Sequence, residues 1–359
     1  MLFRSHQHLL LLGLICIGAG LPLGVQMSPL LTLLSLGVAT RWMDVRGDVV
    51  GLRISSDARV FLVITFVLAG AALEIGLIFS LVALGVYISF RLLRFPDLTV
   101  DGSFPLGGAV AATMIAAGHD PFTATIAATL AGAIAGLITG WLNVSLKIMD
   151  LLASILMMIA LYSINLRIMG KPNVPLITEP TVFNLLQPEA LADYVFRPLL
   201  LVFVVLAVKL ALDGFFATQS GLAIRATGSN ARMARAQGVN TGMAILAGMA
   251  LSNALVGLAG ALFAQTQGGA DISMGVGTIV IGLAAVIVGE SLLPSRKLYL
   301  ATIAVIVGAI VYRFFIALAL NSDFIGLQAQ DLNLVTAVLV TVALVVPRLR
   351  AHWSGKKGA

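Results

Sequence analysis

Long apolar runs alternate with short polar stretches along most of this chain. The runs are 9–40, 60–90, 121–146, 151–168, 198–216, 242–267, 275–292, 298–318 and 332–347. Most of them approach or exceed the ~20 apolar residues that an α-helix needs to cross the hydrocarbon core of a bilayer. We therefore predict an all-α polytopic membrane protein with about 9–11 transmembrane helices, one or more of them broken.

One stretch between apolar runs lacks helical character. Residues 95–104 (FPDLTVDGSF) contain a proline, a glycine and two aspartates, and the apolar segment 105–118 that follows is short for a full span. Non-helical backbone at membrane depth is tolerated only where it is buried in protein or lines a wet cavity. We predict a broken helix whose polar side chains line a passage, namely Asp97, Thr99, Asp101 and Ser103. The alternative is a surface loop in which Asp101 or Ser103 caps a helix from Pro105.

The first apolar run permits two interpretations. Residues 9–40 hold no Asp, Glu, Lys or Arg but contain two prolines, so the run is either a signal peptide or a broken membrane helix. We favour an uncleaved helix because the run is longer than the ~7–15 residues of a signal h-region. The expected domains are an N-terminal extra helix with a polar linker (1–59), a transmembrane domain (60–347) and a basic cytoplasmic tail (348–359).

The longest basic interruption is residues 221–240 (GLAIRATGSNARMARAQGVN), which hold three arginines and no acidic residue. Asn230 can cap a short helix over 231–237, which would place Arg232 and Arg235 one turn apart. Fixing the orientation of the chain requires only the positive charge. A capped helix suggests in addition a surface that a partner holds. Both interpretations are open on residue chemistry alone.

Composition and charge support a membrane protein. Of the 359 residues, 59% are hydrophobic and 11% are charged, whereas a soluble domain is about 25% charged. The formal net charge is +6. The positive-inside rule places residues 221–240, 295–297 and the C-terminal tail in the cytoplasm and residues 170–196 outside. The basic residues suit anionic lipid headgroups, and no aromatic-interleaved basic patch indicates nucleic acid binding.

Several residues inside the predicted spans are candidates for packing or for the passage. Three amides can hydrogen-bond a solute or join helices: Asn165, Asn253 and Gln265. Three glycines at four-residue spacing favour close helix packing: Gly132, Gly136 and Gly140. Two ion pairs are expected, Lys209 with Asp213 and Glu290 with Arg296.

The sequence offers little for catalysis. Cys16 is the only cysteine, and the four histidines form no H-E-x-x-H motif, so no cysteine-based or zincin-type metal site is expected. No Walker A motif is present, so the chain does not hydrolyse ATP by that route. We expect no enzyme, no metal and no cofactor in this chain.

Three segments resemble the branched-chain amino acid permease family of ABC importers. Residues 221–240 are similar to the family's coupling-helix loop, 84–112 to an early conserved segment of one subgroup, and 253–290 to its later conserved helices. The likeness covers about residues 73–347. It implies a permease subunit in a bacterial inner membrane, with the C-terminus cytoplasmic, that passes an amino acid or similar small organic solute inward.

The resemblance also implies partners and roles. Separate ATPase subunits would bind ATP and Mg²⁺, an external solute-binding protein would deliver the solute, and the permease would form a dimer, which we expect to be a homodimer. The residues expected to couple to the ATPase are Arg225, Asn230, Arg232, Met233, Arg235 and Gly238. The residues expected along the translocation path are Asp97, Thr99, Asp101, Ser103, Asn165, Asn253 and Gln265.

Two other classes of protein fit parts of the pattern. An ion-coupled secondary transporter would act without an ATPase but would need a relay of intramembrane carboxylates or histidines. Glu74 and Asp101 are the visible members of such a relay. A membrane scaffold without transport explains the hydropathy but not the helix-forming arginine loop.

Overall fold

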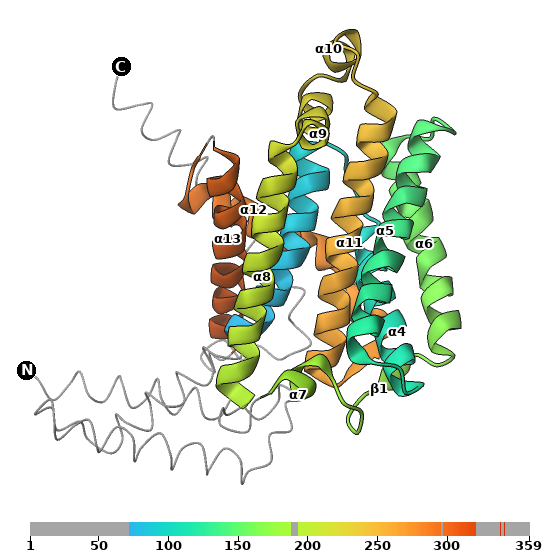
Figure 1. Ribbon diagram of the computed structural model, residues 1–359, viewed down its shortest axis with the longest axis vertical. Helices are drawn as coiled ribbons and strands as arrows, with labels where there is room; N and C mark the ends of the chain where they lie inside the picture. Colours follow the sequence, from blue (N-terminus) through green and yellow to red (C-terminus); the bar gives the residue numbers. More distant parts are fainter. Residues whose placement is uncertain (1–71, 188–192, 296, 321–337, 339–340, 342–359) are drawn as a thin grey trace, which may run out of the picture. The chain divides into compact units, whose positions relative to one another are not determined.

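The computed structural model describes residues 72–187, 193–295, 297–320, 338 and 341 (Figure 1). Glu74–Tyr312 belong to one compact unit, and the contacts reported below lie within it. Seven helices among the described residues are long and apolar enough to cross a membrane, which confirms the predicted all-α polytopic class. The predicted segments 1–59 and 348–359 lie outside the described residues.

The long helices of the unit run between two ends, at which short elements and turns connect them. The helix Ala72–Leu92 ends in a π-helical segment, η1 (Tyr87–Leu92). The long helices that follow are α5 (Pro121–Val144), α6 (Asp150–Met169), α8 (Asp193–Ala217), α11 (Thr241–Gln267), α12 (Thr278–Leu292) and α13 (Leu298–Leu320). Figure 1 shows the short helix α10 (Ala231–Ala236) at one end of these helices and β1 (Asn173–Pro175) with α7 (Val182–Leu186) at the opposite end.

The helix α4 (Val100–Ala116) is too short to cross a membrane. At ~1.5 Å per residue its 17 residues extend about 25 Å, against a hydrocarbon core of about 30 Å. The prediction that residues 95–104 are non-helical is therefore wrong in its second half, because the helix begins at Val100 and contains Pro105. Proline has no N–H, so Pro105 leaves the Asp101 carbonyl without its helical donor. Gly275 packs against that carbonyl and against the Pro105 ring.

Close packing of α4, α5 and α11 forms the centre of the unit. The three predicted glycines of α5 are buried, and the backbone of α11 lies against Gly132 and Gly136. On α11, Gly257 lies against the backbone of α5 and Gly260 against the backbone of α4. Because these residues lack a Cβ, the helix backbones approach each other closely.

A small β-sheet at the end opposite α10 was not predicted. β1 pairs antiparallel with β2 (Gly269–Asp271), and the backbone N–H of Leu176 donates to the Gly268 carbonyl at 2.7 Å. The sheet ties the loop after α6 to the end of α11. Asp271 then caps the short 3₁₀ turn η2 (Ile272–Gly275), which leads into α12.

Candidate functional site

The basic interruption between α8 and α11 folds into two helices. The first, α9 (Gln219–Ser229), is capped by Thr218, and the second is α10. The sequence prediction included only the second helix, because Gly221 and Gly228 suggested breaks. Both glycines instead serve close packing. A Cβ at position 228 would overlap the carbonyl oxygen of Leu92, at the end of η1.

Asn230 begins α10 by capping it. Its Oδ1 accepts hydrogen bonds from the backbone N–H groups of Arg232 and Met233, both at 3.1 Å. The helix ends at Ala236, one residue before the predicted end. Gly238 then turns the chain with φ of 83°, a conformation that favours glycine, and Asn240 caps α11 through the N–H of Met243 at 3.1 Å. Capping residues therefore fix both ends of this connection.

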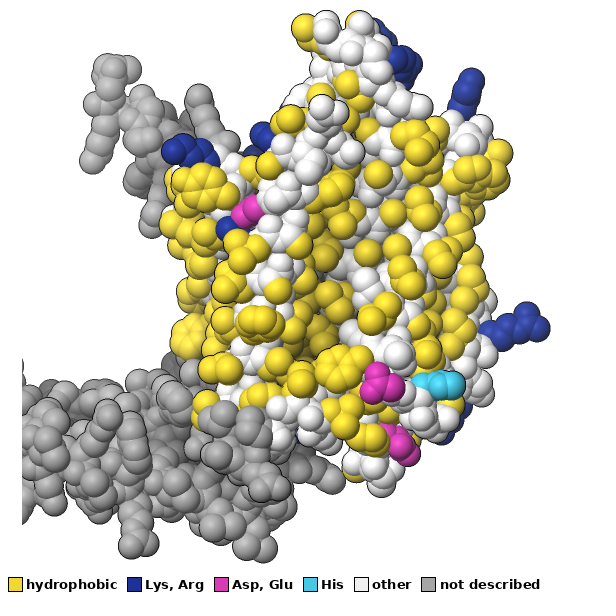
Figure 2. All heavy atoms as spheres, in the orientation of Figure 1, with side chains coloured by type: hydrophobic (Ala, Val, Ile, Leu, Met, Phe, Trp, Pro, Cys, Tyr) yellow, Lys and Arg dark blue, Asp and Glu magenta, His cyan; other side chains and the backbone are white. Residues whose placement is uncertain are grey.

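The predicted coupling residues divide into two groups. Arg232 and Met233 are exposed, and Met233 is 64% exposed although its side chain is apolar. Arg235 donates to the hydroxyl of Thr241 at 3.2 Å and so fastens α10 to α11. Arg225 is half-buried on α9. Figure 2 shows basic side chains gathered at the α10 end, and mostly hydrophobic side chains over the middle of this face.

Four of the predicted path residues meet in one buried cluster near the start of α4. Asp97 accepts from the Thr99 backbone N–H at 3.0 Å and from the Asn253 side-chain amide at 2.8 Å. The Ser103 hydroxyl donates to Asn253 Oδ1 at 2.7 Å. Thr99 also shares a 2.9 Å hydrogen bond with Thr139 of α5, a residue that the sequence did not single out. All five side chains are essentially inaccessible to solvent.

The other two amides have different hydrogen-bond partners, and Asn165 borders this cluster. Asn165 of α6 donates to the Gly102 carbonyl at 3.1 Å, and its Oδ1 meets no donor among the described residues. Gln265 is near the opposite end of α11, where it donates to Thr125 at 2.9 Å and accepts from the Val182 N–H at 3.0 Å. Both amides join separate elements, and a role of either in the path stays a prediction.

Asp101 caps a helix, but not the predicted one. Neither Asp101 nor Ser103 caps a helix from Pro105, since α4 starts after Thr99 and has no side-chain cap. Asp101 Oδ1 instead accepts from the backbone N–H of Ile279, in the first turn of α12, at 2.7 Å. The N-cap position of α12 is Gly277, which has no side chain for this purpose. The carboxylate therefore joins the beginnings of two helices that are far apart in sequence.

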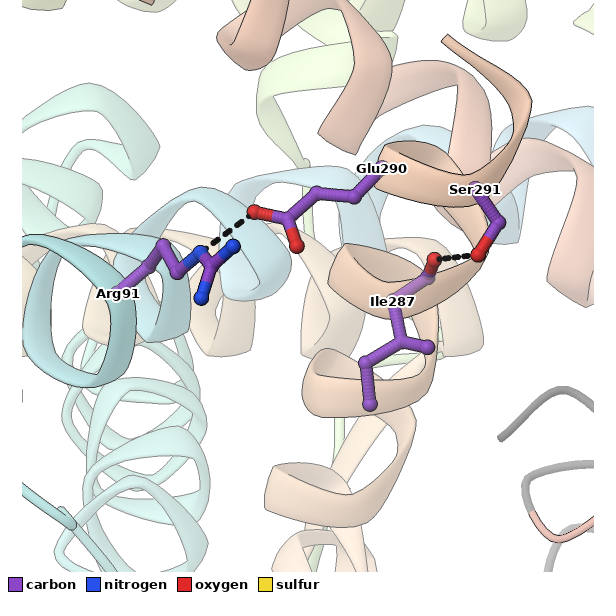
Figure 3. Close-up of polar contacts among 4 residues, drawn as sticks. All are labelled: Arg91, Ile287, Glu290 and Ser291. Carbon is purple, nitrogen blue, oxygen red and sulfur yellow. Dashed lines mark hydrogen bonds and ion pairs between the residues drawn. The ribbon is translucent and has the colours of Figure 1, made fainter. Parts of the chain in front are cut away.

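Two ion pairs lie toward the α10 end. Lys209 and Asp213 of α8 pair at 2.6 Å as predicted, and Asp213 also accepts from the Thr302 hydroxyl at 3.0 Å. Glu290 pairs with Arg91 of η1 at 2.7 Å (Figure 3). Arg296 lies outside the described residues, so the predicted Glu290–Arg296 pair stays a prediction. The sequence did not suggest Arg91 because it lies 199 positions away.

The described part of the chain contains no group of three or more His, Cys, Asp or Glu side chains that could hold a metal ion. Seven candidate spans, a shorter apolar helix and a buried polar cluster at its start define a multi-pass membrane protein of the permease class. The chain belongs to the family described as "Branched-chain amino acid transport system / permease component", whose model matches residues 68–346. It is accordingly a permease component of an amino-acid-type transport system and not an enzyme.

Two relatives extend this finding. The chain is 40% identical over 275 residues to a "Tyrosine transport system permease protein" of Clostridioides difficile (strain R20291), a match that covers 76% of this chain and 89% of the relative. It is 34% identical over 285 residues to the "Uncharacterized protein RP368" of Rickettsia prowazekii (strain Madrid E), covering 76% of this chain and 95% of the relative. No solved structure matches the chain significantly.

Proposed function

We propose that this chain is the permease subunit of a bacterial ABC importer that passes an amino acid or similar small solute into the cell. It sits in the cytoplasmic membrane with its C-terminus inside, and two copies form the transport unit. An external binding protein delivers the solute. Separate ATPase subunits, which bind ATP and Mg²⁺, supply the energy. The family match and the C. difficile relative support a transport system for amino acids.

The observation that carries the ATPase coupling is the construction of α10. This helix of six residues is capped by Asn230, ended by the turn at Gly238 and fastened to α11 by Arg235. An arrangement this well fixed presents Arg232 and the apolar side chain of Met233 outward. An exposed cation beside an exposed methionine suits a groove on a partner protein better than it suits water.

The contacts of α9 and α10 give a route from this surface to the buried cluster. Gly228 packs against Leu92, and Asp97 follows Leu92 by five positions. The intervening backbone is irregular, with the π-helical turn η1 before it and Arg94 at φ of 57° within it. A displacement of α9 therefore acts on the segment that holds Asp97. The ATPase must contact the inward and outward states differently for this to bias transport.

An ion-coupled secondary transporter is the weaker candidate. Such a protein needs a series of titratable groups that passes a proton or cation across the membrane. Within the described residues, Asp97 has an amide and a backbone N–H as partners, and Asp101 has a helix N-terminus. These contacts hold helices together and do not lead on to a further carboxylate or histidine.

The exposed residues of α10 allow a direct test with a matched control. We expect Met233→Glu and Arg232→Glu each to abolish co-purification of the ATPase and to abolish solute uptake, while the chain inserts and melts as the wild type does. Met149 is 70% exposed in the turn before α6, at the same end of the unit, so Met149→Glu makes the same change outside α10. Normal uptake by Met233→Glu, or equal loss in Met149→Glu, would refute the coupling role.

A further inference from the structure

A cavity of about 400 Å³ lies beside the Arg91–Glu290 pair. Its volume falls in the range of roughly 300–1,000 Å³ that is usual for small-molecule sites. Besides the two charged residues, its lining includes Leu293, Pro294, Ala301 and Ala304. The cavity lies toward the α10 end of the unit, because Arg91 precedes Leu92, which packs against Gly228 of α9.

The ion pair leaves much of its hydrogen-bonding capacity unused. Among the described residues, the hydrogen bond of this pair joins Nε of Arg91 to Oε1 of Glu290 (Figure 3). A guanidinium group has five N–H donors, and a carboxylate has about four acceptor positions. The side chains are 62% and 32% exposed, so both remain accessible from the cavity. A ligand can therefore add to the pair without first breaking it.

The nearby ion pair Lys209–Asp213 is already satisfied by its own contacts. Lys209 and Asp213 neutralise each other at 2.6 Å, and Thr302 satisfies a further oxygen of Asp213. The remaining lining near the pair is mostly apolar, with Leu293, Pro294, Ala301 and Ala304, and also includes the polar Ser295. The cavity thus offers one cation and one anion side by side against a hydrophobic surface.

We propose that this cavity is a binding site for a zwitterion that carries an ammonium group and an acidic group a few bonds apart. The acidic group accepts from the terminal nitrogens of Arg91, and the ammonium donates to Glu290. A side chain or linker then lies against Leu293 and Pro294. A free α-amino acid has this chemistry, and so does a phosphatidylethanolamine headgroup. For the amino acid, the inference rests on the proposed importer function and places a solute site near the cytoplasmic exit.

A structural brace alone does not account for the arrangement. An ion pair with no further role can be largely buried within one helix, as the Lys209–Asp213 pair of α8 is, with side chains only 10% and 17% exposed. The Arg91–Glu290 pair instead borders an open volume and is the more exposed of the two. The matching of charges to a zwitterion and the adjoining apolar wall together favour a ligand site.

The test uses the full-length chain in nanodiscs of phosphatidylcholine and phosphatidylglycerol, titrated calorimetrically with each of the twenty amino acids. We expect at least one to bind. The analogues of that amino acid that lack either the carboxylate or the ammonium should bind at least about tenfold more weakly, the loss of one charge-assisted hydrogen bond. Arg91→Gln and Glu290→Gln should weaken binding by a similar factor. Glu179→Gln, in the loop at the opposite end, is the control.

A second arm identifies the lipid source. Native mass spectrometry measures phosphatidylethanolamine retained by the wild type and by the same variants. One outcome is that the wild type retains phosphatidylethanolamine, that Arg91→Gln and Glu290→Gln lose it, and that no amino acid binds. This outcome supports the site, with a lipid as its zwitterion. If neither ligand depends on the two side chains, the proposal is overturned. If Arg91→Gln does not fold, Arg91→Lys replaces it in the test. Because lysine keeps the positive charge, Arg91→Lys is expected to bind within a few-fold of the wild type.

Failure of this site is distinguishable from failure of the proposed function. Met233→Glu should bind the amino acid as the wild type does, while losing ATP-driven uptake. Normal uptake by that variant would refute the coupling role and leave the zwitterion site standing. Conversely, unaltered ligand binding by Arg91→Gln and Glu290→Gln, with no uptake by Met233→Glu, would refute only the site.

Discussion

The glycines of α5 predict a graded response to one repeated change, glycine to alanine. A Cβ at Gly132 or Gly136 would lie closer than 3.0 Å to a carbonyl oxygen of α11, that of Asn253 or of Met249. Backbone cannot rotate aside as a side chain can, so α5 must move away from α11. At Gly140 the nearest atom is the Cδ2 of Leu246 at 3.3 Å, which is the end of a flexible side chain.

The magnitudes follow from these contacts. Overpacking a tight interface costs typically about 1–3 kcal/mol. Replacing a helical glycine by alanine stabilises a helix by roughly 0.5–1 kcal/mol where there is room. Gly132→Ala and Gly136→Ala should therefore destabilise the protein by about 1–2 kcal/mol after this gain is subtracted, whereas Gly140→Ala should be neutral or slightly stabilising.

The assay is thermal denaturation of fluorescent fusions in detergent, followed by size-exclusion chromatography. The three variants share the helix, the substitution and the bilayer environment, so they serve as controls for one another. We expect lower melting temperatures for the first two variants and an unchanged or higher one for Gly140→Ala. Equal loss of stability in all three, or no loss in any, would show that the described α5–α11 contact is not the one that stabilises the folded protein.

Three further predictions follow from particular contacts. Gly228→Val should lower both the melting temperature and uptake, because its side chain must push Leu92 away, and retention of both would contradict the α9 contact. Asp101→Ala should destabilise by about 0.5–2 kcal/mol, as loss of a helix cap does, measured in the same melting assay against Asp120→Ala, which removes a conventional cap at the start of α5. The single variant Lys209→Met should be less stable than the double variant Lys209→Met/Asp213→Leu, because the single change leaves the Asp213 carboxylate without its cation. Additive losses of stability would indicate that the two residues are not coupled.

The features that could be predicted from the sequence are those that depend on residues close together in the chain. The apolar spans were recognisable from composition over some twenty residues. The cap at Asn230 and the Lys209–Asp213 pair depend on residues within four positions, and the structure has both. The start of α9 at Thr218 was not predicted.

Contacts between distant residues were beyond such reasoning. The described partner of Glu290 lies 199 positions away, and the backbone N–H from which Asp101 accepts lies 178 positions later. Thr139 entered the buried cluster only because α5 packs beside α4. Gln265 and Asn253 share one helix and a side-chain amide, yet they lie in different surroundings because they face different elements. Local patterns identify which residues are polar and within a span, whereas tertiary packing decides which of them meet.

The junction of α4 with the start of α12 carries a consequence for sequence variation. Asp101 is held twice, through its carboxylate by Ile279 and through its carbonyl, freed by Pro105, against Gly275. A side chain at position 275 would collide with both that carbonyl and the proline ring. Because the carbonyl is the nearer of the two and belongs to the backbone, a change at position 105 would not remove that overlap, so relatives that keep this junction should keep glycine at 275.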